Sequence, residues 1–179
     1  MEQVLPGQLS KRKKLERLIR VDHAGEYGAK RIYQGQLDVL EGTDKEEIIR
    51  HMAEQEEIHL QTFEKLMIEK RIRPSLLHPF WHVSGYFLGY VTAKMGEKAA
   101  MACTVAVEEV IDEHYKNQLE ELGNDEPEIR AYIERFRAEE QEHRDTGLEH
   151  DAALTPAYGL LKKVIGDCSK AAIWIAERI

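Results

Sequence analysis

The chain has 179 residues, of which 32% are charged, and its formal net charge at pH 7 is −8. A chain of this length without a Pro-, Gly- or Ser-rich linker predicts a single domain over residues 1–179, large enough to bury a core. The acidic balance argues against a nucleic acid partner, which would need a basic face. The longest mostly apolar stretch, residues 80–93, is shorter than the roughly 20 residues of a membrane-spanning helix.

Apolar residues recur at three- and four-residue steps along most of the chain, which predicts long amphipathic helices. Gly42 and Gly123 end two of these stripes, and Pro127 opens another. Pro74 and Pro79 predict an irregular connection between the second and third helices. The predicted helices cover residues 15–40, 48–66, 80–95, 101–119, 129–147 and a segment after Pro156. Since no strand-like alternation occurs, the predicted fold class is all-α.

Helices one to three and four to six look like two copies of one unit, about residues 10–95 and 97–179. A shift of 82 residues matches four pairs, including Gln36 with Gln118 and Leu37 with Leu119, and a shift of 84 matches two. The other four matched pairs are Glu26 with Glu108, Tyr33 with Tyr115, Glu56 with Glu140, and His59 with His143. Two such repeats predict a pseudo-twofold axis through a four-helix bundle, with the two short apolar helices, after Pro79 and Pro156, in matching places.

Two Glu-x-x-His motifs, Glu56 to His59 and Glu140 to His143, lie within these stripes. Residues three positions apart lie on one face of a helix, so the glutamate and the histidine of each motif can bind one metal ion. The six candidate metal ligands are Glu26, Glu56, His59, Glu108, Glu140 and His143. Burying a carboxylate without a partner costs on the order of several kcal/mol of folding free energy, because the charge loses its water. No Lys or Arg lies on the same stripes, so bound cations are needed to balance the four carboxylates. Oxygen-rich ligands with one imidazole per ion favour two iron ions, with manganese as second choice.

Three sequence runs extend this interpretation: Val21–Ala29, Ala102–Glu109 and Gly147–Ala152. They resemble the demethoxyubiquinone hydroxylases of ubiquinone biosynthesis, and the resemblance extends from about Arg17 to the C-terminus. It implies a ferritin-like di-iron protein in which the four glutamates bind iron, two of them as bridges, and each histidine completes one site.

The resemblance also implies the reaction. A 2-polyprenyl-3-methyl-6-methoxy-1,4-benzoquinol (demethoxyubiquinol) would be hydroxylated on its ring with O2, with NADH as reductant. Three other ferritin-like functions stay open: a rubrerythrin-like peroxidase, a manganese catalase and an iron-storage protein. The aromatic short helices favour the hydroxylase, because storage gives no reason for exposed Trp81 and Trp174.

Five further residues carry predicted roles. His114 and Tyr115 follow Glu108 and are either core residues or a substrate and proton-transfer pair beside the metals. Asp22 lies one turn before Glu26 and is predicted to hold the distal nitrogen of a ligand histidine. Arg17 and Arg20 are candidates for guiding the cofactor, although a solvated face is the simpler interpretation.

Helices three and six are more apolar and aromatic than one core-facing stripe requires, which predicts a peripheral membrane face and the mouth of a substrate channel. The expected location is the cytoplasmic face of a bacterial membrane, or the matrix face of the mitochondrial inner membrane for a trimmed eukaryotic form. Expected partners are the polyprenyl benzoquinol, a lipid-binding helper protein or other ubiquinone-biosynthesis enzymes, and a second copy of the chain in a homo-oligomer.

Overall fold

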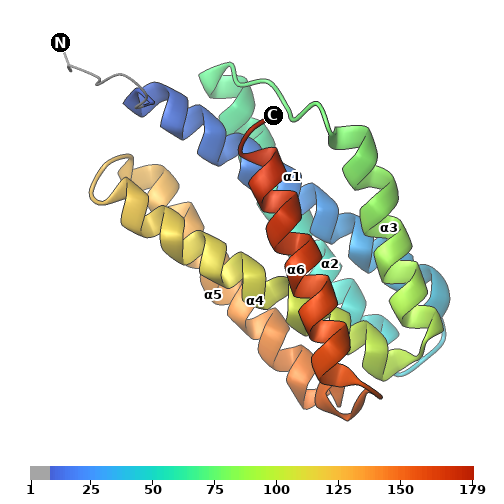
Figure 1. The fold of residues 1–179 in the computed structure, drawn as a ribbon. Helices are drawn as coiled ribbons and strands as arrows, with labels where there is room; N and C mark the ends of the chain where they lie inside the picture. The colour runs from blue at the N-terminus through green and yellow to red at the C-terminus, as the bar shows by residue number, and fades with distance from the viewer. Residues whose placement is uncertain (1–8) are drawn as a thin grey trace.

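The computed structural model describes residues 9–179, and over that range every regular element is a helix (Figure 1). The helices are α1 (Lys11–Leu40), α2 (Glu46–Lys70), α3 (His78–Lys94), α4 (Glu97–Leu122), α5 (Pro127–Glu149) and α6 (Tyr158–Ala176), and a short 3-10 helix covers Ala152–Leu154. The four long helices α1, α2, α4 and α5 form a bundle, while α3 packs on α1 and α6 packs on α4. The predicted all-α, ferritin-like bundle with two additional helices is confirmed.

Helix boundaries follow local chemistry more closely than apolar spacing. α1 begins at Lys11, because the Ser10 side chain caps it by accepting a hydrogen bond from the Lys13 N–H at 3.4 Å. α3 begins at His78, so Pro79 lies inside the helix rather than before it. Proline is tolerated there because the first backbone N–H groups of a helix have no intrahelical partner.

Two apolar clusters fill the bundle on either side of its middle. The first contains Leu18, Ile19, Phe63, Leu66, Tyr115, Ile133 and Phe136. The second contains Tyr33, Leu40, Ile49, Met52, Met101 and Val105. Along each of α1, α2 and α4, the candidate ligands fall between residues of the two clusters, and on α5 they follow the first cluster. The buried carboxylates therefore meet at mid-bundle.

The order of these clusters also fixes the helix directions. α2 and α4 both run from the second cluster to the first, so they are parallel. The chain must return along the bundle between them, and α3 makes that return beside α1 (Figure 1). Within residues 9–179, no helix combines the length and the apolar character needed to cross a membrane.

The seam between α1 and α3 depends on glycine. A Cβ atom added at Gly89 would overlap the backbone of Ile32, and one added at Gly35 would overlap the backbone of Tyr86. Glycine is the residue that lets two helix backbones approach this closely. The seam therefore sets the position of α3 against the bundle.

Gly89→Ala is expected to lower the free energy of unfolding of the metal-free protein by about 1–3 kcal/mol, because the new methyl group overpacks the seam. Gly28→Ala in α1 is the matched control, since no atom lies within 4 Å of its added Cβ. That control should gain about 0.5–1 kcal/mol from helix propensity. Urea denaturation of both variants measures the difference, and equal stabilities would contradict a tight seam.

Candidate metal centre

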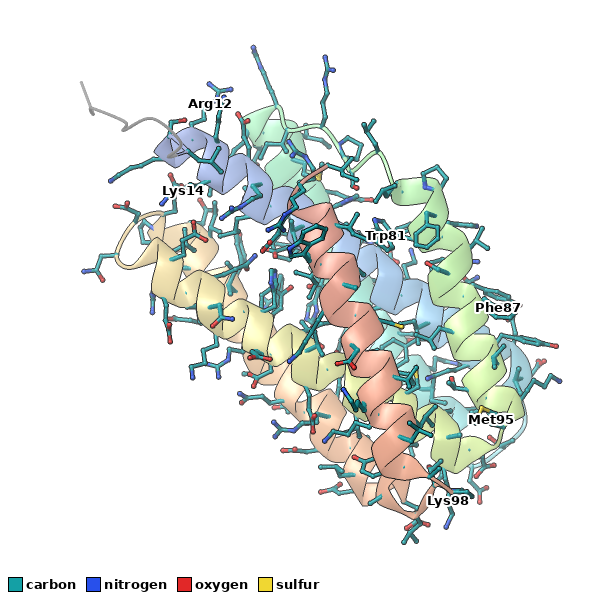
Figure 2. The ribbon with its side chains drawn as sticks, viewed as in Figure 1. Arg12, Lys14, Trp81, Phe87, Met95 and Lys98 are labelled. Carbon is teal, nitrogen blue, oxygen red and sulfur yellow. The ribbon has the colours of Figure 1, made fainter. Side chains whose placement is uncertain are left out.

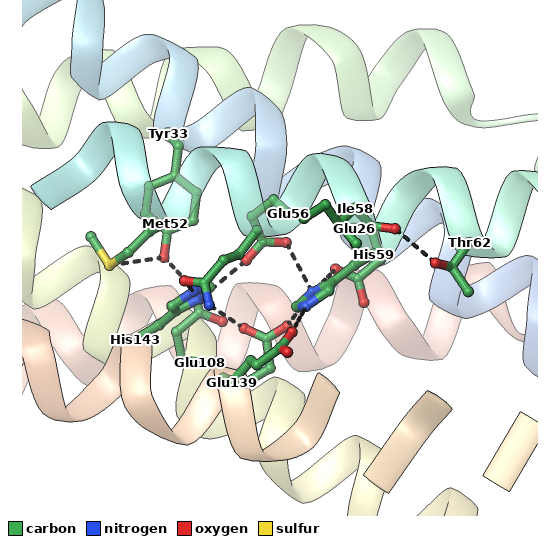
Figure 3. A network of polar contacts seen from close by, with 12 residues as sticks. Glu26, Tyr33, Met52, Glu56, Ile58, His59, Thr62, Glu108, Glu139 and His143 are labelled. Carbon is green, nitrogen blue, oxygen red and sulfur yellow. Dashed lines mark hydrogen bonds and ion pairs between the residues drawn. The ribbon is translucent and has the colours of Figure 1, made fainter. Parts of the chain in front are cut away.

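The structure brings the six predicted ligands together in the middle of the bundle. One group of potential ligand atoms comes from Glu26, Glu56, His59 and Glu140, and a second comes from Glu56, Glu108, Glu140 and His143. Within each group the atoms lie no more than 4.8 Å apart, and all four residues are buried. Figure 3 shows the labelled histidines directed toward the carboxylates.

Two glutamates belong to both groups. The Nδ1 atom of His59 lies 3.1 Å from Glu140 Oε1 and 3.5 Å from Glu26 Oε2. The Nδ1 atom of His143 lies 3.1 Å from Glu140 Oε2 and 3.3 Å from Glu56 Oε1. Each oxygen of Glu140 thus faces a different histidine, and the same holds for Glu56, whose Oε2 is 4.0 Å from His59 Nδ1. Glu56 and Glu140 therefore lie between the two ligand histidines.

Several buried polar atoms of this cluster have no hydrogen-bond partner. They are Glu26 Oε2, both carboxylate oxygens of Glu56, His59 Nδ1, Glu108 Oε2 and Glu140 Oε1. In the described part of the chain, the ion-pair partners of Glu26, Glu56 and Glu140 are histidines, and no Lys or Arg side chain forms an ion pair with any of the four ligand glutamates. Unpartnered oxygen and imidazole donors without thiolate fit two iron or manganese ions.

Burial also shifts the acidities of the metal-free cluster. It raises the pKa of Glu56 and of Glu108 well above the usual value, and it raises the pKa of Glu26 to about 6. Burial alone would lower the pKa of both histidines. Hydrogen bonds and charges of the surrounding carboxylates outweigh it, so the pKa rises to about 12 for His59 and to about 11 for His143. Without cations, the cluster compensates its charge with protons.

Side chains around the cluster hold it in reciprocal pairs. The hydroxyl of Tyr33 donates to Glu108 Oε1 at 2.7 Å, and the hydroxyl of Tyr115 donates to Glu26 Oε1. Each tyrosine thus binds a glutamate of the other half of the chain. Both tyrosines are only 1% exposed, so these two hydrogen bonds orient the carboxylates in a site that is shielded from water.

The outward nitrogens of the ligand histidines have partners that sequence reasoning missed. His59 Nε2–H donates to Glu139 at 2.5 Å, and His143 Nε2–H donates to Gln55 at 2.9 Å. Such partners fix the ring orientation and leave Nδ1 free to bind metal. Each partner directly precedes a ligand glutamate in the chain. This shared position in the two matched motifs is the sequence feature from which both partners could have been predicted.

Asp22 differs from its predicted role. Its carboxylate lies 3.2 Å from His114 Nε2 and accepts a hydrogen bond from the Gln118 side chain at 2.6 Å, so it contacts neither ligand histidine. One helical turn before Glu26, Asp22 faces His114 and Gln118 of α4 instead of the metal cluster. Burial raises its pKa against the lowering effect of His114.

The comparison with known proteins agrees with this geometry. Residues 13–176 match the protein family described as Ubiquinone biosynthesis protein COQ7. The chain belongs to this family.

Curated relatives of this COQ7 family member cover most of its length. The 3-demethoxyubiquinol 3-hydroxylase of Rhodospirillum rubrum is 52% identical over 179 residues, which are 99% of this chain and 84% of that protein. The human NADPH-dependent 3-demethoxyubiquinone 3-hydroxylase is 50% identical over 92% of this chain and 78% of its own length. The Saccharomyces cerevisiae 5-demethoxyubiquinone hydroxylase is 40% identical over 92% of this chain and 78% of its own length.

The remaining predicted site residues of this COQ7 family chain lie away from the metal cluster. Arg17 donates to both carboxylate oxygens of Glu121, at 3.0 and 3.1 Å, and Arg20 donates to the backbone oxygen of Arg73. Neither arginine points to the ligands, and their role in guiding a cofactor stays a prediction.

A groove of about 400 Å³ between α2 and α5 reaches the cluster from the side opposite α3 and α6. His143, Gln55 and Met52 line its inner part. The other lining side chains are mostly charged or imidazole groups: Glu47, His51, Glu142, Glu149 and His150. Among the ligand histidines, His143 is the one that this groove reaches, since His59 is not part of its lining.

Proposed function

We propose that this chain is a di-iron monooxygenase that hydroxylates the ring of a demethoxyubiquinol, a 2-polyprenyl-3-methyl-6-methoxy-1,4-benzoquinol, in ubiquinone biosynthesis. The observation that carries the proposal is the buried cluster of four glutamates and two histidines in a COQ7 family chain. The relatives' names number the hydroxylated carbon as 3 or as 5, and both describe demethoxyubiquinone hydroxylases.

The protein's own residues would divide the work at this site. Glu56 and Glu140 would hold both ions, while Glu26 and Glu108 would each complete one coordination sphere. When bound in the reduced state, a di-iron pair supplies the electrons and the Lewis acidity that activate O2. The apolar clusters at both ends of the bundle exclude water, which protects the reaction from side products.

His114 and Tyr115 would serve as a proton-transfer pair beside the centre. The hydroxyl of Tyr115 contacts the ligand Glu26, and its neighbour His114 contacts Asp22 at a side-chain exposure of 14%. No hydrogen bond among the described residues joins these two pairs, but Asp22 lies one helical turn before Glu26, which brings a metal ligand near a partly exposed imidazole. Proton exchange with solvent along this route would need a water molecule between the two pairs, and the bundle would not have to open.

The reductant is proposed to be a reduced nicotinamide nucleotide. The sequence resemblance suggested NADH, whereas the human relative is named as NADPH-dependent. Comparing kcat/KM for NADH and NADPH with the iron-loaded protein decides between them.

The proposed activity can be tested with anaerobically purified, iron-loaded protein, a short-tailed demethoxyquinol, NADPH or NADH, and ¹⁸O₂. We expect one ¹⁸O atom in the ring of the product and no product from metal-free protein. In a parallel assay with added hydrogen peroxide, loss of the peroxide without a hydroxylated ring would favour a peroxidase or catalase. Iron uptake into large oligomers without product would favour storage.

We also propose that α3 and α6 bind a membrane surface, where a polyprenyl quinone would reside. Their exposed apolar side chains are Phe80, Val83 and Phe87 on α3 and Leu160, Val164 and Trp174 on α6. Phe87 projects from α3 away from the bundle in Figure 2. Trp81, expected at this surface, is only 8% exposed because it packs with Val21, Ala24 and Ala176. The exposed set remains large enough to suggest a lipid contact.

Liposome flotation tests this surface. The wild type should float with vesicles that contain anionic lipid, and the double variant Phe87→Glu with Trp174→Glu should stay unbound, because two charges would enter the interface. Ile68→Glu is the control, since Ile68 is 79% exposed on α2, outside this surface. A wild type that does not associate with any vesicle would remove the membrane proposal.

A further inference from the structure

The two halves of the metal centre are matched in their ligands but not in the groups behind them. Residues 55 and 139 are separated by 84 positions, the same shift that relates the two Glu-x-x-His motifs. Both accept a hydrogen bond from the outward nitrogen of a ligand histidine. Behind His59 the acceptor is the carboxylate of Glu139, and behind His143 it is the amide of Gln55.

A carboxylate and an amide affect a metal-bound imidazole differently. A carboxylate that accepts the Nε2–H makes the imidazole a stronger donor and adds a negative charge near the ion. An amide fixes the ring but adds no charge. Arg135 lies 3.5 Å from the other oxygen of Glu139, whose side chain is 26% exposed, so part of this charge is screened. The hydrogen bond from His59 is made to Glu139 Oε2, which Arg135 does not contact.

The surroundings of the two histidines differ in the same sense. The ring of His59 packs on Phe136 with a centroid distance of 4.0 Å, inside the first apolar cluster. His143 instead lines the groove between α2 and α5. Glu47, Glu142 and Glu149 also line this groove, and carboxylates there raise the local concentration of divalent cations. An ion beside His143 therefore has a route to water that the groove does not offer to an ion beside His59.

We propose that the two metal positions are unequal, with the His59 position binding its ion first and more tightly because of Glu139, and the His143 position exchanging its ion through the α2–α5 groove. The inference rests on the proposed di-metal function. It assigns Glu139 and Gln55 as the positioning residues that set the difference.

Anaerobic titration of metal-free protein with Co²⁺, followed by calorimetry and by visible absorption, tests the order of binding. The wild type should bind two ions in two resolved steps. His59→Ala should lose the tighter step, and His143→Ala should lose the weaker one. After loading, a chelator should remove one ion faster, and this fast phase should be absent in His143→Ala.

Exchanging the groups behind the histidines tests their role. Glu139→Gln should weaken the tighter step by about 10- to 100-fold, the usual effect of losing such a partner. Gln55→Glu should strengthen the weaker step, which a merely disruptive substitution would not do. Glu134→Gln is the matched control on α5, because this carboxylate pairs with Arg130 and is 51% exposed. It removes the same charge and should leave both steps unchanged.

The outcomes separate this inference from the proposed function. Two ions bound with one common affinity, or loss of the tighter step in His143→Ala, would overturn the inference and leave the hydroxylase proposal intact. Unchanged binding in both Glu139→Gln and Gln55→Glu would do the same. A wild type that binds fewer than two Co²⁺ ions, and makes no hydroxylated product when supplied with iron, would overturn both.

Discussion

Glu140→Ala is expected to leave the protein unable to hold either metal ion and to reduce ring hydroxylation by more than about 100-fold, the upper range for residues that only support a ligand. Its two carboxylate oxygens face different ligand histidines, so both coordination spheres lose a donor at once. Glu26→Ala removes a donor from one group only and should retain more iron. Metal analysis of anaerobically purified variants measures the difference.

The control for this experiment is Glu109→Ala. Glu109 directly follows the ligand Glu108, but its carboxylate points outward and pairs with Lys162 at 2.6 Å. About two irons per chain in this variant, and few in Glu140→Ala, would support the helical register of the site. Equal iron content in Glu109→Ala and Glu140→Ala would contradict the assignment of Glu140.

The metal-free protein is expected to be most stable near pH 5 and to lose stability toward pH 8. The pKa of Glu26 rises from 4.5 to about 6 on folding, and those of Glu56 and Glu108 rise further. The folded state then keeps protons that the unfolded chain releases, so stability falls as the pH rises above 4.5. For Glu26 alone the loss is about 2 kcal/mol.

The histidines act in the same direction at higher pH, and one carboxylate acts in the opposite direction in acid. The pKa of His59 and His143 rises from 6.5 to about 12 and about 11, so their contribution is complete below pH 6.5 and is lost above it. Burial works against ionisation of Glu140, but both histidines lower its pKa from 4.5 to about 2. Its contribution is therefore lost as the pH falls from 4.5 to about 2.

Bound metal should reverse the alkaline trend, because metal binds the deprotonated ligands and stabilises the folded state by mass action. Melting temperatures of metal-free and Mn²⁺-loaded protein from pH 5 to 8 should diverge as the pH rises. Glu108→Gln should flatten the curve of the metal-free protein, since it removes one carboxylate with a raised pKa. A metal-free protein that becomes more stable from pH 5 to 8 would contradict the buried cluster.

Helical periodicity was sufficient to predict the fold class and to place six ligand candidates on the buried stripes of four helices. This works because a carboxylate at a core position conflicts with its apolar neighbours, and the conflict is visible in a single sequence. The structure brings these six residues together in two groups, and Glu56 and His59 of α2 both belong to the first group. Which two glutamates lie between the histidines could not be predicted, since this depends on which oxygen of Glu56 or Glu140 faces which histidine.

Residues beside the stripe were harder to predict. Glu139 and Gln55 were missed because spacing assigns a residue to a face of its own helix but not to a partner on another helix. The same limitation explains Asp22, which lies on the correct face but contacts His114 on α4. Trp81 was expected to be exposed because composition cannot show that α6 contributes Ala176 to cover it.

The return of the chain along α3 has a practical consequence for anyone who wants a version of this protein without its proposed lipid contact. α3 links two parallel helices, so deleting it and joining α2 to α4 with a short loop would reverse α4, which would place Met101 and Val105 beside the first cluster and Tyr115 beside the second. α6 follows all four bundle helices along the chain, so it could be removed without changing the order of the ligand helices. Truncation is therefore available at one apolar helix, whereas the other can be changed only by substituting its surface.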